Sequence, residues 1–125
     1  MGMNSKKIIL HIEDNPDNRL LVRRLLMSSG YQVLEATNAY EAIARLRRYR
    51  PDLILMDINM PIIDGYTLTS KFKTVQGLEK IPIIAITANA MRGDRERSFL
   101  AGCDGYVEKP IDIDKLLSQI TRYIG

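Results

Sequence analysis

The pattern of apolar positions divides the chain into five short hydrophobic runs, each with the length and composition of a β-strand. These runs are KIILHI from Lys7, YQVLEA from Tyr31, LILMD from Leu53, IPIIAIT from Ile81 and GYVEK from Gly105. Five stretches with the spacing of amphipathic helices follow them, from Pro16 to Ser29, Ala39 to Arg50, Tyr66 to Thr74, Met91 to Ala101 and Asp112 to Ile124. The pattern therefore predicts a strict alternation of strand and helix.

Strict alternation is typical of an α/β fold, because parallel strands need a crossover connection that a helix supplies. Helices on both faces of such a sheet explain why the predicted strands are apolar throughout rather than at every second residue. We therefore expect a three-layer, doubly wound fold with a five-stranded parallel sheet. In folds of this class, ligands bind at the carboxyl ends of the strands.

The residues at the predicted helix ends agree with this division. Asn38 with Glu41 resembles a capping box, and Pro16 suits a first helical turn. Gly102 follows the end of one predicted helix, and Pro51 stops another.

The length and composition fit one soluble domain. Of the 125 residues, 46% are hydrophobic and 26% charged, the balance of an ordinary folded protein. Charges interrupt the apolar runs well before membrane-spanning length, and no stretch long enough for a signal peptide follows the first residues. We expect a cytoplasmic protein with no membrane partner, in which residues 1–6 are an N-terminal extension, disordered or left from expression, and residues 7–125 form the domain.

The net charge of +3 comes largely from arginines, including those of the segment RLRRYR from Arg45. A basic segment can bind nucleic acid, yet on a helix whose other face is apolar it is more often a solvated surface. Nucleic-acid binding also calls for a one-sided basic footprint. We therefore expect no nucleic-acid partner.

Polar residues stand at or just after the carboxyl ends of four predicted strands. Glu13 and Asp14 follow the first strand, and Asp57 ends the third. Thr87 ends the fourth strand, and Lys109 stands at the carboxyl end of the fifth. Singly, each has an ordinary explanation as a turn residue, a helix cap or an exposed lysine. With the first and third strands as neighbours, the three carboxylates converge, because adjacent strands lie ~4.8 Å apart. Lys109, two strands from Asp57, is ~10 Å away by backbone, and its stem can reach across. We expect these five residues to form one site.

Three carboxylates within about 4 Å of one another repel by roughly several kcal/mol at the effective dielectric of a protein surface, so the site needs a cation. Carboxylate oxygens beside a phosphate are typical of Mg²⁺, with Mn²⁺ as the alternative, whereas Ca²⁺ would need more protein oxygens. The metal, the Lys109 ammonium and the Thr87 hydroxyl can neutralise the oxygens of a phosphoryl group in transfer. Asp57 is then the candidate nucleophile, because aspartyl phosphates are a recognised covalent intermediate.

Four segments also resemble, in order and spacing, the receiver domain of two-component response regulators: HIEDN, LILMDINMPIIDG, IAITANA and DGYVEKP. The resemblance extends from Lys7 to Ile124. It implies the flavodoxin-like strand order 2-1-3-4-5, phosphorylation of Asp57, and a magnesium ion held by Glu13, Asp14 and Asp57. Glu rather than Asp at position 13 is the one departure from the pattern.

The same resemblance implies a switch around the phosphoacceptor. Lys109 would bind the phosphoryl group, Thr87 would supply the switch hydroxyl, and Tyr106 would be the switch aromatic that turns inward when the Thr87 hydroxyl moves toward the phosphoryl group.

Three further residues would complete the site. Asn59 would give a backbone carbonyl to the metal, and small Ala88 would leave room for the phosphoryl group. Pro110 would follow a cis peptide bond, which proline permits. His11 lies within the first strand, where a buried histidine is expected rather than a phosphodonor.

These observations predict a signalling module that accepts a phosphoryl group from a histidine kinase or a histidine phosphotransfer protein and then changes its affinity for partners. A flavin carrier would need a phosphate loop where the acidic EDNPDN stands. An aspartate-dependent phosphatase would need a second carboxylate where Asn59 stands, and a cap domain. An unphosphorylated scaffold would have a broken site. We expect no enzyme activity beyond turnover of the protein's own phosphoaspartate.

Output is expected at the surface made by the fourth helix, fifth strand and fifth helix, where the resemblance places partner docking or self-association. No output domain follows Gly125, so we expect either a stand-alone regulator or a receiver excised from a larger protein. The segment ITANAMRGDRERSFLAGCDGYVEKPI is similar to receivers of hybrid kinases and phosphorelays.

Overall fold

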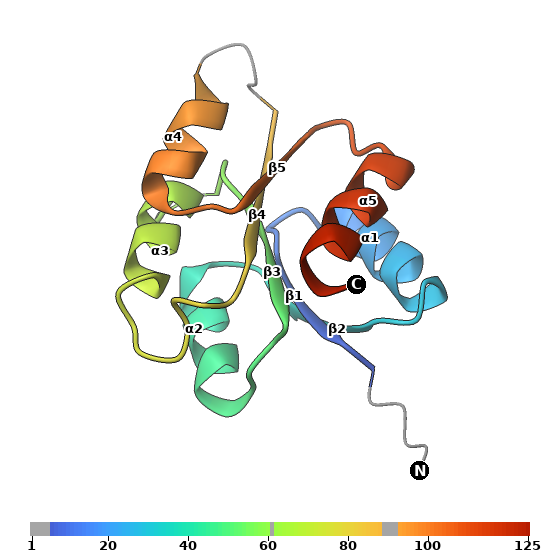
Figure 1. Ribbon diagram of the computed structural model, residues 1–125, viewed down its shortest axis with the longest axis horizontal. Coiled ribbons are helices and arrows are strands. Elements are labelled where there is room, and N and C mark those ends of the chain that lie inside the picture. The colour runs from blue at the N-terminus through green and yellow to red at the C-terminus, as the bar shows by residue number, and fades with distance from the viewer. Residues whose placement is uncertain (1–5, 61, 89–92) are drawn as a thin grey trace.

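The computed structural model describes residues 6–60, 62–88 and 93–125, and its elements alternate as predicted (Figure 1). The strands are β1 (Ile8–Ile12), β2 (Gln32–Ala36), β3 (Leu53–Asp57), β4 (Ile83–Thr87) and β5 (Gly105–Glu108). The helices are α1 (Pro16–Ser28), α2 (Ala39–Arg48), α3 (Gly65–Phe72), α4 (Asp94–Ala101) and α5 (Ile113–Ile124).

The predicted boundaries that fall on described residues lie within two residues of these. The start expected for the fourth helix, Met91, lies outside the described residues, and so do residues 1–5 of the expected N-terminal extension. Within the described ranges, no helix combines the length and the apolar character that crossing a membrane requires.

The strands form one parallel sheet in the order β2-β1-β3-β4-β5, which confirms the order implied by the resemblance. β1 pairs with β2 on one side and with β3 on the other, so the winding of the chain reverses there. The register sets Asp57 beside Ile86 and Thr87 beside Glu108. The predicted site residues therefore gather at the same end of the sheet.

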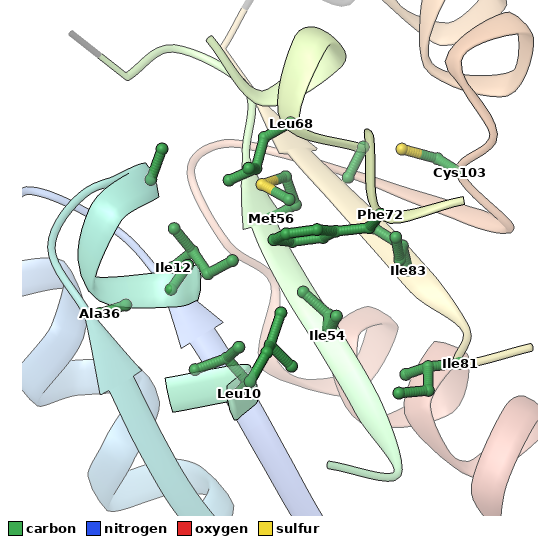
Figure 2. Packing of buried hydrophobic residues seen from close by; sticks show 14 of the residues in the cluster. Leu10, Ile12, Ala36, Ile54, Met56, Leu68, Phe72, Ile81, Ile83 and Cys103 are labelled. Carbon is green, nitrogen blue, oxygen red and sulfur yellow. The ribbon is translucent and has the colours of Figure 1, made fainter. Parts of the chain in front are cut away.

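Helices cover both faces of the sheet, with α1 and α5 on one face and α2, α3 and α4 on the other (Figure 1). Because successive strand residues point to opposite faces, each face has its own buried cluster. In β1, Leu10 and Ile12 join the cluster under α2 and α3, whereas Ile9 joins the cluster under α1 and α5. Figure 2 shows Phe72 of α3 packed beside Met56 of β3 in the first cluster. The three-layer architecture is confirmed.

Four of the five helices begin at a side-chain cap, in which a backbone N–H three residues on donates to the N-cap side chain. These caps are Asn15, Asn38, Asp64 and Asp112. α4 differs, because its N-cap is Gly93, in the left-handed region at φ 76°, and makes no side-chain cap hydrogen bond. Its C-cap is the predicted Gly102, also left-handed at φ 114°.

Candidate functional site

The acidic pair Glu13 and Asp14 follows directly on β1. The Glu13 N–H donates to the Ala36 carbonyl at 2.9 Å, which continues the pairing of β1 with β2. The Glu13 side chain is buried, whereas Asp14 is exposed. The Arg19 guanidinium donates from α1 to the carbonyl oxygens of both acidic residues at 2.9 Å. Both β2 and α1 therefore hold the loop that carries the pair.

Asp57 ends β3 in the interior of the sheet and is 1% exposed. The Asn59 N–H donates to Asp57 Oδ1 at 3.0 Å and orients the carboxylate. The Gly65 N–H, at the start of α3, donates to the Ile58 carbonyl at 3.1 Å. A Cβ at Gly65 would lie 2.7 Å from the Asp57 carbonyl oxygen, so α3 can pack this closely only with glycine.

Lys109 reaches the carboxylates from the end of β5. Its backbone N–H donates to the Thr87 carbonyl at 2.8 Å, and its peptide bond to Pro110 is cis, as the resemblance implied. Its ammonium nitrogen lies 3.4 Å from Asp57 Oδ1 and 3.4 Å from Glu13 Oε1. Side chains from the ends of β1, β3 and β5 thus meet at one point.

The three carboxylates form a compact cluster. Glu13, Asp14 and Asp57 each offer an oxygen, and these atoms lie within 4.8 Å of one another. Burial and the neighbouring Asp57 carboxyl raise the pKa of Glu13 to about 7, although the Lys109 ammonium lowers it. One ammonium therefore leaves the cluster short of positive charge. The donor set consists of oxygens, which suits Mg²⁺ or Mn²⁺.

Thr87 and Ala88 lie at the end of β4, the strand next to Asp57. The Thr87 hydroxyl donates to Asp94 Oδ2, in the first turn of α4, at 2.5 Å, and both side chains are buried. The Ala88 N–H donates to Asn59 Oδ1 at 3.4 Å and so links the ends of β3 and β4. In this structure, the Thr87 hydroxyl, which is expected to bind the phosphoryl group, donates its hydrogen bond to α4 instead.

Tyr106 of β5 lies beside Ala85 of β4 and packs against the buried cluster under α2 and α3. Its hydroxyl oxygen is buried and has no hydrogen-bond partner among the residues that the structure describes. Burial raises the pKa of Tyr106. The side chain expected to turn inward therefore already has its hydroxyl inside the protein in this structure.

His11 is fully buried in β1, as expected, and neither imidazole nitrogen has a partner within the described part of the chain. Burial, with smaller contributions from Lys109 and Arg19, lowers the pKa of His11 to about 3. A neutral, buried imidazole has no access to a phosphoryl donor, which agrees with the exclusion of His11 as a phosphodonor.

Three residues that support the site were missed by sequence reasoning. Arg19 was counted only among the arginines that make up the net charge, although its place one helical turn after the acidic loop is a usable signal. Gly65 could have been found from its position, because it is a glycine directly before a predicted helix and shortly after Asp57. The sequence contains no comparable signal for Asp94, because its neighbours in the chain do not indicate that its side chain reaches Thr87.

Known proteins resemble this chain over nearly its whole length. The family model described as response regulator receiver domain matches residues 9–121. The polar-differentiation response regulator DivK of Brucella anthropi is 42% identical over 119 residues, which cover 95% of this chain and 97% of the relative.

Two solved structures are similar to this one. The receiver domain of the sensor histidine kinase PA1611 from Pseudomonas aeruginosa, with a magnesium ion coordinated in its active-site cleft, has a TM-score of 0.89 and 38% identity, over 97% of this chain and 99% of that one. The chemotaxis response regulator CheY4 of Vibrio cholerae has a TM-score of 0.89 and 25% identity, over 95% of this chain and 99% of that one.

Proposed function

This chain belongs to the response regulator receiver domain family, and on that premise we propose that Asp57 is the residue that accepts the phosphoryl group. Members of this family are the phosphoacceptor signalling domains of two-component systems, and the chain has that function. The observation that carries the assignment is the position of Asp57: a buried carboxylate within 4.8 Å of two others and 3.4 Å from the Lys109 ammonium.

The acidic cluster supports Mg²⁺ as the cofactor. The carboxylates of Glu13, Asp14 and Asp57 would hold the ion, together with the backbone carbonyl of Asn59, and Mn²⁺ would fit the same oxygens. The raised pKa of Glu13 fits this set, because a cation stabilises the ionised form that burial and Asp57 disfavour. When bound, the ion supplies positive charge to phosphoryl oxygens.

The reaction assigned to Asp57 is an exchange of one phosphorus bond for another. A carboxylate oxygen of Asp57 attacks the phosphorus of a phosphohistidine on the partner, the P–N bond breaks as the P–O bond forms, and the departing imidazole takes up a proton. The Lys109 ammonium neutralises the phosphoryl oxygens during transfer. Water later attacks the same phosphorus and releases inorganic phosphate and Asp57. This turnover of its own phosphoaspartate is the only catalysis that we assign to the chain.

Intact mass spectrometry after incubation with acetyl phosphate and Mg²⁺ tests the assignment. The parent should gain the mass of one phosphate, and EDTA should abolish the gain. Asp57→Asn keeps the shape of the side chain and removes the nucleophile, so it should fold normally and gain nothing. Asp17→Asn is the matched control, since Asp17 is an exposed carboxylate just beyond the acidic loop. Phosphorylation of Asp57→Asn at the rate of the parent would refute the assignment.

As a receiver domain, the protein works with a histidine kinase or a phosphotransfer protein and with downstream partners. We assign the output to the surface of α4, β5 and α5. That surface contains a groove of about 890 Å³, lined by Arg95 and Phe99 of α4, Tyr106 of β5 and Arg122 of α5, among others. Leu100 of α4 is 88% exposed, which leaves an apolar side chain available to a partner or a second copy.

Amide hydrogen exchange tests the output assignment. Beryllofluoride with Mg²⁺ imitates the phosphoryl group, and in the parent it should change protection in α4, β5 and α5. Thr87→Ala should bind the same probe yet show much smaller changes, because it lacks the hydroxyl that responds to the phosphoryl group. Changes confined to α2, or full changes in Thr87→Ala, would contradict this route.

A further inference from the structure

A buried hydrogen bond joins the end of β4 to the first residue of α4. The Thr87 hydroxyl donates to Asp94 Oδ2 at 2.5 Å. Thr87 is fully buried, and Asp94 is only 6% exposed. Hydrogen bonds from a hydroxyl to a carboxylate are short, charge-assisted and about twice as strong as neutral ones. This contact therefore contributes strongly to the direction in which the Thr87 hydroxyl points.

Asp94 is also tied to its own helix and to α3. Its carbonyl oxygen accepts from the Ser98 hydroxyl at 2.6 Å and from the Tyr66 hydroxyl at 3.4 Å. The Arg97 guanidinium lies 4.3 Å from the centre of the Tyr66 ring. The N-cap of α4, Gly93, has no side chain that could anchor this end of the helix. The hydrogen bond between the Asp94 side chain and Thr87 thus connects the N-terminus of α4 to the sheet.

The same hydroxyl has a second prospective acceptor. β3 and β4 are neighbours, and Thr87 lies one residue beyond Ile86, the register partner of Asp57. A phosphoryl group on Asp57 therefore brings acceptor oxygens to the end of the strand next to Thr87. A threonine hydroxyl has one proton to donate. The Asp94 carboxylate and the phosphoryl group compete for that proton.

We propose that Asp94 is a positioning residue that holds the Thr87 hydroxyl away from the phosphorylation site and sets the threshold of the switch. The inference rests on the roles proposed for Asp57 and Thr87. When the hydroxyl turns to the phosphoryl group, the buried Asp94 carboxylate loses a charge-assisted hydrogen bond and must find water or another donor. Because Asp94 is the first residue of α4, its movement transmits the event to that helix.

The affinity for beryllofluoride, titrated by calorimetry at a fixed Mg²⁺ concentration, tests this competition. Asp94→Ala removes the competing acceptor and should bind the probe about tenfold more tightly than the parent. Asp94→Asn keeps an oxygen acceptor without the charge and should fall between the two. Glu96→Ala is the matched control, because Glu96 is an exposed acid in the same first turn of α4, and it should bind like the parent.

A double-mutant cycle with Thr87→Ala separates this mechanism from a general loosening of α4. In the Thr87→Ala background, Asp94→Ala should leave the affinity for beryllofluoride unchanged. Tighter binding of the same size in that background would overturn the inference, and so would unchanged or weaker binding when Thr87 is present. Thermal melts check that each variant folds. If Asp94→Ala does not fold, Asp94→Asn is carried through the same cycle.

The outcomes also separate this inference from the proposed function. A parent protein that neither binds beryllofluoride with Mg²⁺ nor gains phosphate would overturn both. A parent that does both, combined with a cycle that shows no coupling between Asp94 and Thr87, would overturn the role of Asp94 alone.

Discussion

Replacing Glu13 by Gln should stabilise the metal-free protein above neutral pH, and Mg²⁺ should remove that advantage. Burial and the Asp57 carboxyl raise the pKa of Glu13 from its ordinary value of 4.5 to about 7 in the folded state. The folded chain therefore holds a proton that the unfolded chain releases, so stability falls as pH rises from 4.5 to 7. Each pH unit in this window costs ~1.4 kcal/mol, which amounts to at most roughly 3–4 kcal/mol above pH 7.

Glutamine keeps the size and shape of the Glu13 side chain but only one of its two hydrogen bonds. The Asn15 N–H donates to Glu13 Oε2 at 3.2 Å and the Asn18 amide donates to Oε1 at 3.3 Å, whereas glutamine has one side-chain oxygen. The lost hydrogen bond lowers the stability of the variant by a similar amount at every pH, so the growth of its advantage with pH reports the ionisation of Glu13.

His11 contributes a pH dependence of the opposite sign and has to be separated from that of Glu13. Burial lowers the pKa of His11 from 6.5 to about 3 in the folded state. The unfolded chain binds a proton between these values that the folded chain does not, so stability rises with pH across that window. For these two groups together, the slopes cancel from pH 4.5 to 6.5. The difference between parent and Glu13→Gln removes the His11 contribution, because His11 is present in both.

Urea unfolding between pH 4.5 and 8, with EDTA or with saturating Mg²⁺, measures this difference. In EDTA, the stability of Glu13→Gln relative to the parent should rise by roughly 2–3 kcal/mol from pH 4.5 to pH 8. With Mg²⁺ the parent should be at least as stable as the variant, because the ion binds the ionised carboxylate. Asp17→Asn, an exposed carboxyl outside the cluster, should show no such growth. Equal profiles in EDTA, or an advantage independent of pH, would refute the reasoning.

Two further substitutions test the supports of the site. Gly65→Ala should lower the free energy of unfolding by ~2 kcal/mol and slow phosphorylation, because the new Cβ would meet the Asp57 carbonyl oxygen at 2.7 Å. Urea unfolding measures the stability, and the initial rate with acetyl phosphate measures phosphorylation. A variant as stable as the parent would contradict the close packing. Arg19→Ala should raise the dissociation constant for Mg²⁺ by about tenfold, since two hydrogen bonds to the acidic loop are lost. Arg19→Lys should restore part of the affinity. An unchanged dissociation constant in Arg19→Ala would show that the loop does not need this support.

The sequence by itself determined the fold class and the cluster of candidate residues. Runs of apolar residues and helix caps are local signals, and strict alternation leaves little choice but a parallel sheet with helices on both faces. Residues at the carboxyl ends of such strands lie at one edge of the sheet, so Glu13, Asp57 and Lys109 were predicted to share that edge from their positions. Their convergence also required the first and third strands to be neighbours, as the structure confirms. The strand order came from the resemblance, because alternation does not distinguish one order of parallel strands from another.

Only the tertiary structure decided which atoms touch. It buried Glu13 and left Asp14 exposed, turned Arg19 onto two backbone carbonyls and directed the Thr87 hydroxyl to Asp94 on the next helix. Pattern assigns a residue to a face of a strand or helix, but the rotamer of its side chain depends on packing against elements distant in sequence. The charge state of a buried carboxyl depends likewise on its three-dimensional neighbours, so the raised pKa of Glu13 required the assembled site.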